Sequence, residues 1–436
     1  MKPERSELAE GIFFNRIPIE KFKTAHLSIY FVTPLCDEAA ASRIALLPAV
    51  LRRGSRLHPT AADLARCQED LYSATLGASV FKTGDQQVLS FSISALRREF
   101  VPDGQDLLPD VAALLSEVVF DPILDPKSAV FLEEYVDGEK RNLVNRIRSI
   151  QNNKASYAAM RCASIMHAGE ACGLHEYGTV EEVQKITPAA LYSAYRTLLA
   201  EAHIEIFYAG TEAEERVLSC IKPALNRIRR YPHTLCMADV QAQRIRRKSV
   251  TERTEVSQAR LCLGFRTGIS YAHEDATVLA LCNYVFAASP TSKLFVNVRE
   301  RLSLCYSCSS SLSLGAGTLT VAAGLETSKR RRAIREIKLQ LRKMRAGKIT
   351  ERELMMAKKT MAGLYLSLYD SPIALERWYL VRSLFGVDTD IESVLASIDS
   401  FGTDDVARVA KCIRLDTVYF LRAEKGSKAE EGEDDE

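Results

Sequence analysis

The chain has 436 residues, of which 47% are hydrophobic and 26% are charged. This composition is that of an ordinary globular protein and excludes a fibrous or fully disordered chain, and the length predicts two or three domains. The 58 basic and 56 acidic residues leave a net charge of +2, so charge gives no reason to expect binding to nucleic acid or to an anionic membrane.

The first ten residues, MKPERSELAE, contain no apolar segment of the kind found in signal peptides. No run reaches the roughly 18 apolar residues that a membrane-spanning helix needs. The eleven cysteines are odd in number and lie mostly within apolar runs such as VLALCNYVF, which is typical of buried free thiols in a reducing compartment. We therefore expect an unexported, cytoplasmic protein with no membrane segment.

The first half of the chain begins with a strand-like segment, TAHLSIYFVT at residues 24–33, followed by a loop and an apolar helical run. A predicted hairpin comes next, in which LGASVFK turns at Thr83-Gly84-Asp85 into QVLSFSISAL. In the second of these strands apolar residues alternate with serines, which indicates one buried face. The apolar positions are Leu89, Phe91, Ile93 and Ala95.

The first half ends with a predicted helix and strand, ITPAALYSAYRTLLAEAHIEIFYAG at residues 186–210. Thr187 suits the N-cap of this helix and Pro188 its first turn. The arginine-rich segment that follows contains Tyr231-Pro232 and is predicted to link two domains.

The second half repeats this order, with a strand-like QARLCLGFRT at 258–267 and a hairpin in which YSCSSSLSL turns at Gly315-Ala316-Gly317 into TLTVAAGLE. Residues 328–346 predict a basic helix, and a capping box from Thr350 to Glu353 starts the next one. We favour a solvated basic face over nucleic-acid binding because no aromatic residues are interleaved with the charges. The apolar face of the basic helix is Ile334, Ile337, Leu341 and Met344.

The two halves also end alike, because IDSFGTDDVARVAKCIRLDTVYFLR at 398–422 matches residues 186–210 at an offset of 212 residues. The chain is therefore predicted to be a tandem duplication of two α+β domains, each a mostly antiparallel sheet of about five or six strands backed by helices on one face. The predicted bounds are 1–220 and 249–425 for the domains, 221–248 for the linker and 426–436 for a disordered acidic tail.

The segment with the most specific chemistry is SPTSKLFVNVRERLSLCYSCSS at residues 289–310. The guanidinium of Arg299 could hold a peptide carbonyl or carboxylate, and the hydroxyl of Tyr306 could donate to a developing oxyanion. The structural alternative is that Arg299 caps or ion-pairs with a helix and that Tyr306 packs on the core.

This segment resembles the C-terminal-domain signature of the pitrilysin family of zinc peptidases, S-x-L-x-x-x-x-R-E-x-x-x-L-x-Y. The matching positions are Ser292, Leu294, Arg299, Glu300, Leu304 and Tyr306. The resemblance covers nearly the whole chain, including YGTVEEVQKIT at 177–187. It implies two tandem pitrilysin-type domains, with Arg299 and Tyr306 as substrate-binding residues.

The first domain in this family carries the zinc motif H-x-x-E-H on a helix. Two histidines four residues apart lie on one helical face and can bind one zinc, and the glutamate between them activates the water. When the Gly-Thr pair that follows this motif is aligned with Gly54-Ser55, the ligand positions fall on Ala45 and Ala49 and the base falls on Pro48. None of these three side chains can bind a metal or move a proton.

The third ligand of the family lies in an E-x6-E element, which by the same resemblance corresponds to Glu139 and Arg146. A cation at position 146 would replace the ligand. The sequence holds seven histidines, and none belongs to an H-x-x-E-H or H-E-x-x-H motif. We therefore expect no metal site and no independent catalysis in this chain.

His167, Glu170 and His175 could be imagined as a small metal cluster. We disfavour this interpretation because Gly169 and Gly173 interrupt the helical spacing and a fourth ligand is missing.

Two thiol interpretations are also disfavoured. Cys305 and Cys308 form a C-x-x-C across a predicted strand, where side chains three apart point to opposite faces. Cys172 near His175 could suggest a nucleophile, but local pairs of this kind are usually accidental.

The resemblance is closest to the zinc-lacking member of bacterial heterodimeric peptidases. It implies a non-catalytic, substrate-binding subunit whose partner is a homologous zinc-bearing subunit and whose substrate is a peptide. One alternative is a scaffold protein of the same fold, for which Arg299 and Tyr306 are dispensable. Another is an independent enzyme, which requires a metal or nucleophile beyond the positions considered above.

Overall fold

The computed structural model describes residues 2–235, 237, 240, 242 and 247–424, and these form two compact units. Unit 1 contains Met1–Arg148, Leu174–Met237 and Ser371–Leu384, and unit 2 contains Ser149–Gly173, Ala238–Asp370 and Phe385–Glu436. The predicted acidic tail at 426–436 lies outside the described residues, as do several positions of the predicted linker.

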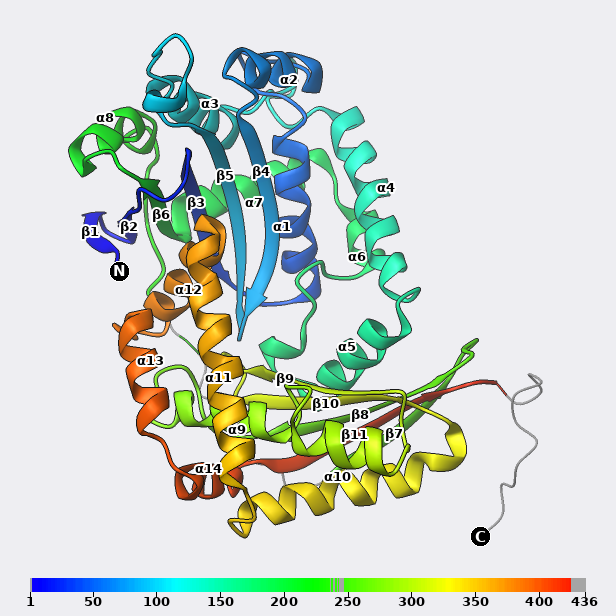
Figure 1. The fold of residues 1–436 in the computed structure, drawn as a ribbon. Coiled ribbons are helices and arrows are strands. Elements are labelled where there is room, and N and C mark those ends of the chain that lie inside the picture. Colours follow the sequence, from blue (N-terminus) through cyan, green and yellow to red (C-terminus); the bar gives the residue numbers. More distant parts are fainter. Residues whose placement is uncertain (1, 236, 238–239, 241, 243–246, 425–436) are drawn as a thin grey trace. The chain divides into compact units, whose positions relative to one another are not determined.

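Unit 1 is built on a six-stranded sheet in the order β1-β2-β6-β3-β5-β4 (Figure 1). The pair β2–β6 is parallel and every other neighbouring pair is antiparallel. The strands are β1 (Glu4–Ala9), β2 (Ile12–Pro18), β3 (Thr24–Pro34), β4 (Thr75–Thr83), β5 (Gln86–Leu96) and β6 (His203–Gly210).

The alternation in β5 is confirmed, because its apolar side chains are buried and the serines between them are partly exposed. The turn before it contains Gly84, whose φ of 60° suits a residue without a Cβ. Helices α1, α3 and α7 cover the apolar face, and their side chains share one core with Leu27, Ile29 and Phe31 of β3. The helices of this face and rim are α1 (Glu38–Leu51), α2 (Ala61–Asp70), α3 (Leu108–Phe120), α4 (Glu133–Ile150), α6 (Val180–Lys185), α7 (Pro188–Glu201) and α8 (Glu214–Leu225).

Unit 2 is built on a five-stranded sheet in the order β7-β11-β8-β10-β9, with β7–β11 parallel and the other pairs antiparallel. This is the order and direction of β2-β6-β3-β5-β4 in unit 1, so the predicted duplication of an α+β fold is confirmed. The strands are β7 (Lys248–Arg253), β8 (Ala259–Arg266), β9 (Ser307–Ser313), β10 (Thr318–Leu325) and β11 (Arg414–Arg422).

The helices of unit 2 begin and end largely as the sequence predicts. In α10 the apolar stripe packs inward, with Ile337, Leu341 and Met344 buried, and the Thr350–Glu353 capping box opens α11. The helices are α9 (Ala276–Phe286), α10 (Arg330–Arg345), α11 (Glu351–Ser367), α13 (Ile391–Ser400) and α14 (Thr403–Ala410), with short 3-10 turns at Thr327–Lys329 and Leu368–Asp370. Two further 3-10 turns, Arg98–Phe100 and Ala171–Gly173, belong to the first half of the sequence.

Each unit also contains one helix from the other half of the sequence. Helix α5 (Lys154–Met166) belongs to unit 2 and packs on β8, β10 and β11, whereas α12 (Pro372–Leu384) belongs to unit 1 and packs on β6. In each half this helix is the third one after the hairpin. Equivalent helices of the repeat are therefore exchanged between the units.

The exchanged helices cover the second face of each sheet, so the expectation of helices on one face only is wrong. Ala158 and Cys162 of α5 form a small buried cluster with Cys262 and Tyr419, whereas Phe265 on the opposite face of β8 contacts α9. A Cβ at position 264 would lie 2.8 Å from Sδ of Met166, so Gly264 allows the close approach of α5. The compact units follow this exchange and are not the contiguous stretches 1–220 and 249–425.

Candidate functional site

Arg299 and Tyr306 lie close together in the sequence of unit 2, Arg299 at a half-buried position and Tyr306 at an exposed position just before β9. Arg299 is in the π-helical segment η3 (Phe295–Arg301), its guanidinium stacks on Phe295 at 4.6 Å, and its Nε lies 3.5 Å from Oε1 of Glu300. The apolar positions of the same motif hold this segment in place, because Leu294 and Leu304 are buried. The motif thus combines buried anchoring residues with exposed polar ones.

Tyr306 is 58% exposed and does not pack in the core, which excludes the buried alternative for this side chain. Its backbone N–H donates to the carbonyl of Gly324 at 2.8 Å. Its hydroxyl donates to Oε1 of Glu326 at 2.8 Å, and this hydrogen bond raises the pKa of Tyr306. The phenol therefore stays protonated and can act as a hydrogen-bond donor.

Cys305 and Cys308 do not point apart as predicted. Strand β9 begins only at Ser307, so the period of two does not extend back to Cys305. A hydrogen bond from Cys308 lowers the pKa of the Cys305 thiol, and the nearby charge of Arg299 lowers it further. The two thiols are therefore neighbours.

The three positions assigned to the zinc-binding helix lie together on α1. Ala45 and Pro48 are buried and Ala49 is half-buried. The Pro48 ring lies inside the helix, where it has no N–H to donate to the preceding turn. Gly54 follows this helix at a point where the chain passes close to Pro59. A Cβ at position 54 would lie 2.1 Å from the carbonyl oxygen of Pro59, so only glycine fits there.

The structure brings Glu139, rather than Arg146, to the end of α1. Both Nε and Nη2 of Arg53 bond to Oε1 of Glu139, and the Glu139 carboxylate is largely buried. Arg146, two turns further along α4, stacks on the ring of Tyr177 at 4.6 Å. The Glu139 carboxylate is therefore neutralised by an arginine that directly follows α1.

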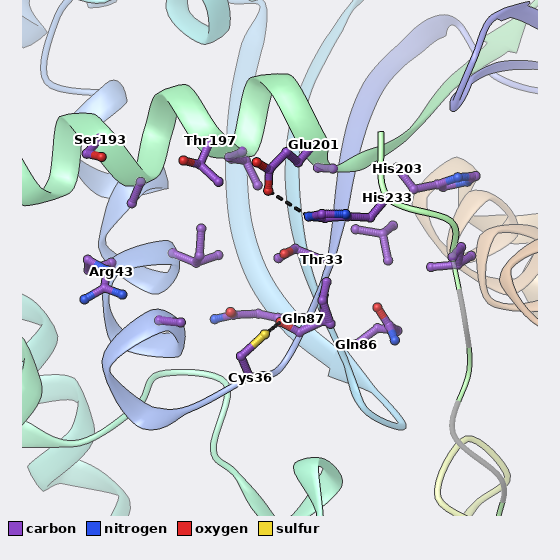
Figure 2. A pocket seen from close by; sticks show the side chains of 18 of the residues that line it. Thr33, Cys36, Arg43, Gln86, Gln87, Ser193, Thr197, Glu201, His203 and His233 are labelled. Atoms are coloured by element: carbon purple, nitrogen blue, oxygen red, sulfur yellow. Dashed lines mark hydrogen bonds and ion pairs between the residues drawn. The ribbon is translucent and has the colours of Figure 1, made fainter. Parts of the chain in front are cut away.

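A pocket of about 550 Å³ opens beside α1 and α7 in unit 1 (Figure 2). Arg43, Gln87 and Thr197 supply polar groups to it, and His233 Nε2 lies 2.8 Å from Oε2 of Glu201 at its wall. None of the predicted site residues lines this pocket. Its mixture of apolar and polar side chains is typical of a small-ligand site.

A buried polar cluster between β3 and α12 was not predicted from the sequence. Ser28 and Tyr30 donate to Oε2 of Glu376 at 2.6 and 3.1 Å, and Nε2 of His26 lies 3.6 Å from the same oxygen. Burial raises the pKa of Glu376 to about 8 and lowers that of His26 to about 4. The period of two in TAHLSIYFVT marks these β3 residues as one face, but nothing local indicates that a distant helix covers them.

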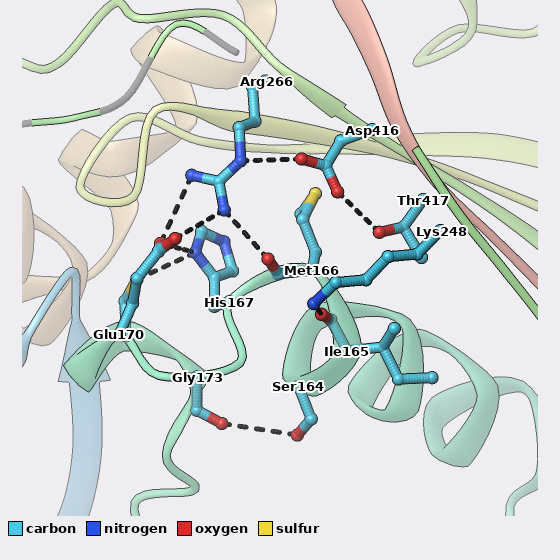
Figure 3. A network of polar contacts seen from close by, with 11 residues as sticks. Ser164, Ile165, Met166, His167, Glu170, Gly173, Lys248, Arg266, Asp416 and Thr417 are labelled. Atoms are coloured by element: carbon cyan, nitrogen blue, oxygen red, sulfur yellow. Dashed lines mark hydrogen bonds and ion pairs between the residues drawn. The ribbon is translucent and has the colours of Figure 1, made fainter. Parts of the chain in front are cut away.

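A second buried network in unit 2 centres on Arg266 (Figure 3). The Arg266 side chain is 1% exposed; its Nε donates to Asp416 at 2.9 Å and its Nη2 to Glu170 at 2.8 Å. Nη2 also donates to the carbonyl of Met166 at 2.9 Å. The network thus ties the end of α5 to β8 and β11.

The metal cluster that was disfavoured from the sequence has a different membership in the structure. His167, Glu170 and Cys172 come together, with donor atoms within 4.8 Å of one another. His175 belongs to unit 1, and its Nδ1 accepts from the backbone N–H of Tyr177 at 3.1 Å. The histidine that contacts Cys172 is therefore His167, and not His175 as considered from the sequence.

No helix among the described residues is long and apolar enough to cross a membrane.

The duplicated sheet order is the one expected of the zinc-peptidase fold, and the sequence contains no H-x-x-E-H motif. Residues 185–361 match the family described as "Peptidase M16 inactive domain". The chain belongs to the M16, or pitrilysin-type, peptidase family and is metalloprotease-like without the family's zinc motif.

Three similar proteins illustrate this membership. The chain is 30% identical over 419 residues to the "Probable inactive metalloprotease YmfF" of Bacillus subtilis, covering 96% of this chain and 97% of the relative. It is 29% identical over 167 residues, or 38% of this chain and 41% of the relative, to the "Uncharacterized zinc protease YmxG" of the same bacterium. A conserved protein from Enterococcus faecalis V583 superposes with a TM-score of 0.91 at 28% identity, covering 98% of this chain and all of that one.

Proposed function

We propose that this chain is the non-catalytic, substrate-binding subunit of a heterodimeric zinc metallopeptidase. Arg299 and Tyr306 contact the peptide, whereas the zinc, its water and the general base come from a homologous partner subunit. The observation that supports this proposal most directly is that both side chains reach solvent from a segment anchored by two buried leucines, Leu294 and Leu304.

The chemistry of the two side chains suits this role. Arg299 is 41% exposed, and its Nε lies 3.5 Å from Oε1 of its sequence neighbour Glu300. A peptide carboxylate or carbonyl can therefore compete for the guanidinium. Tyr306 keeps its proton because its pKa is raised, and a protonated phenol can donate to an oxyanion.

The altered zinc site supports a role without independent catalysis. The side chains of Ala45, Pro48 and Ala49 supply no ligand. The pairing of Glu139 with Arg53 also supports Glu139, rather than Arg146, as the remnant of the third ligand position. A partner that carries H-x-x-E-H would supply what these positions lack.

The proposal is supported by the presence of both kinds of relative in one bacterium, since the two proteins from Bacillus subtilis are named as a probable inactive metalloprotease and a zinc protease. We place the heterodimer in the cytoplasm, in keeping with the free cysteines.

The test is to purify this chain and the zinc-bearing M16 protein of the same organism separately and together. Peptide hydrolysis by the mixture, with little or none by either chain alone, is the expected result. If the zinc-bearing chain is equally active alone and does not bind this chain, the heterodimer proposal is wrong. If the two bind without any change in activity, the scaffold alternative is the better account.

A further inference from the structure

The loop after α5 is folded back on itself. Gly169 has a φ of 84°, a conformation that glycine adopts easily, and it reverses the chain directly after the helix. The N–H of Glu170 donates to the carbonyl of His167 at 2.8 Å, and that of Gly173 donates to Glu170 at 2.9 Å. A Cβ at position 173 would lie 2.5 Å from the His167 oxygen, so two glycines permit a closed loop.

This loop brings three metal-binding side chains to one point. His167 Nδ1 lies 2.7 Å from Oε2 of Glu170 and 3.0 Å from Sγ of Cys172, and Sγ lies 3.7 Å from the same Oε2. Both Glu170 and Cys172 contact the same ring nitrogen of His167, Nδ1. The three residues therefore do not form a catalytic triad. A relay of the Cys-His-Glu type needs the two partners on different ring nitrogens.

Two arrangements can hold these three atoms together. A proton on Nδ1 of His167 can be donated to Oε2 of Glu170 while the thiol of Cys172 donates to the same oxygen. One cation in the middle instead accepts electron pairs from all three atoms at once.

Two carboxylates, Glu170 and Asp416, and two cations, Arg266 and Lys248, belong to this network. With a neutral histidine and thiol these charges sum to zero, and a divalent cation that displaces the thiol proton of Cys172 adds one positive charge. The guanidinium of Arg266 holds the Glu170 carboxylate from the far side, and Asp416 holds Arg266 in turn (Figure 3). Such outer partners are typical of ligating carboxylates.

We propose that Nδ1 of His167, Oε2 of Glu170 and Sγ of Cys172 form a Zn²⁺ site that fixes the loop after α5. A mixed nitrogen, oxygen and sulfur donor set is one that zinc accepts. Zinc–ligand distances of about 2.0–2.3 Å place tetrahedral donors roughly 3.3–3.8 Å apart. The two shorter distances, from Nδ1 to Oε2 and from Nδ1 to Sγ, reach this range when the atoms move by less than about 1 Å. A water molecule fills the fourth coordination position of the zinc.

Helical spacing does not decide which of these residues meet, because α5 ends at Met166 and Gly169 turns the following residues back toward it. This zinc site does not depend on Arg299, Tyr306 or a peptidase partner. If the protein binds no zinc here, the proposed function is unaffected.

The test uses the full chain, stripped of metal with a chelator and titrated with Co²⁺ alone and then with Zn²⁺. One Co²⁺ per chain is expected, with a thiolate-to-cobalt charge-transfer absorption that Zn²⁺ displaces. Cys172→Ser should abolish this absorption and lower the affinity at least about tenfold. Cys36→Ser is the matched control, because Cys36 is an exposed thiol of unit 1 and its loss should change neither quantity.

A second measurement needs no variant. Zn²⁺ should slow the alkylation of Cys172 in the wild-type protein, measured by peptide mass, while Cys36 reacts at the same rate with and without Zn²⁺. Equal alkylation of Cys172 in both conditions, or a cobalt absorption that persists in a folded Cys172→Ser protein, would overturn the proposal.

Discussion

The hydroxyl of Tyr306 and the carboxylate of Glu326 form a 2.8 Å hydrogen bond on the surface of unit 2. Nζ of Lys329 donates to the same carboxylate oxygen at 2.9 Å. Glu326 therefore competes with any substrate oxygen for the Tyr306 proton, and the phenol must leave this carboxylate before it can donate to an oxyanion.

In the assembled peptidase, Tyr306→Phe should lower kcat by about 10²-fold, because it removes one donor to the oxyanion. Binding of the partner and zinc content should remain unchanged, since the exposed ring makes little core contact. Peptide hydrolysis, co-purification and metal analysis measure these quantities. Tyr231→Phe is the control, as Tyr231 is an exposed tyrosine of unit 1.

Arg299→Ala should likewise reduce turnover in the assembled peptidase, and Glu326→Gln should leave it equal or higher because the competing acceptor loses its charge. Wild-type turnover by correctly assembled Tyr306→Phe and Arg299→Ala complexes would contradict the shared-site proposal.

The buried network of unit 2 predicts a large loss of stability on removing Arg266. Arg266→Met leaves Asp416 and Glu170 without their cation in a buried setting, and the free energy of unfolding should fall by about 3–5 kcal/mol. Arg408→Ala breaks the exposed pair with Asp275 and should cost less than about 1 kcal/mol. Urea unfolding of both variants checks the contrast, and equal losses would show that the network contributes little.

The cluster at Glu376 predicts a pH-dependent stability. Glu376 keeps its proton in the folded state up to a pKa of about 8, whereas the unfolded chain loses it near pH 4.5, so this residue lowers stability as pH rises between these values. His26, with a folded pKa of about 4, lowers stability as pH falls from 6.5 to 4. The two effects offset one another between pH 4.5 and 6.5.

From pH 6.5 to 8 only the glutamic acid effect remains, worth roughly 2 kcal/mol. The difference in stability between wild type and Glu376→Gln should therefore change by about this amount across that interval, measured by urea unfolding at both pH values. A constant difference would mean that Glu376 is already ionised at pH 6.5.

Introducing the family's histidines and glutamate into helix α1 should not by itself create a zinc site. In a Cys172→Ser background, which removes the loop site, the triple change Ala45→His, Pro48→Glu and Ala49→His should bind no zinc, because the third carboxylate is held by Arg53. Adding Arg53→Ala should free Glu139 and yield one zinc per chain by metal analysis. If adding Arg146→Glu succeeds where Arg53→Ala fails, position 146 is the third ligand position.

Much of the fold follows from short-range patterns. The period of two in QVLSFSISAL, the glycine turns and the N-cap at Thr187, which accepts from the N–H of Ala190, are local features that the structure confirms. The similarity between residues 186–210 and 398–422 was enough to predict the duplication and hence two related sheets.

The remaining features depend on tertiary contacts. Helices α5 and α12 have ordinary helical sequences, and neither contains a signal for the sheet that it covers. The polar face of β3 therefore did not indicate its partner Glu376. The return of Glu170 and Cys172 to His167 depends on two glycines, Gly169 and Gly173, whose role is visible only in the folded loop. The motif at 292–306 could be located, but its division into buried anchors and exposed donors needed the structure.

The exchange of α5 and α12 makes the two halves of the gene interdependent during synthesis. When the ribosome has released residues 1–237, the sheet of unit 1 is complete, yet Ser28 and Tyr30 still lack the helix that covers them until residues 371–384 emerge. Helix α5 meanwhile has no sheet to cover until β8, β10 and β11 have been made. Expression of either half alone would leave one sheet face bare and one helix without its partner, so neither half is a self-sufficient folding unit.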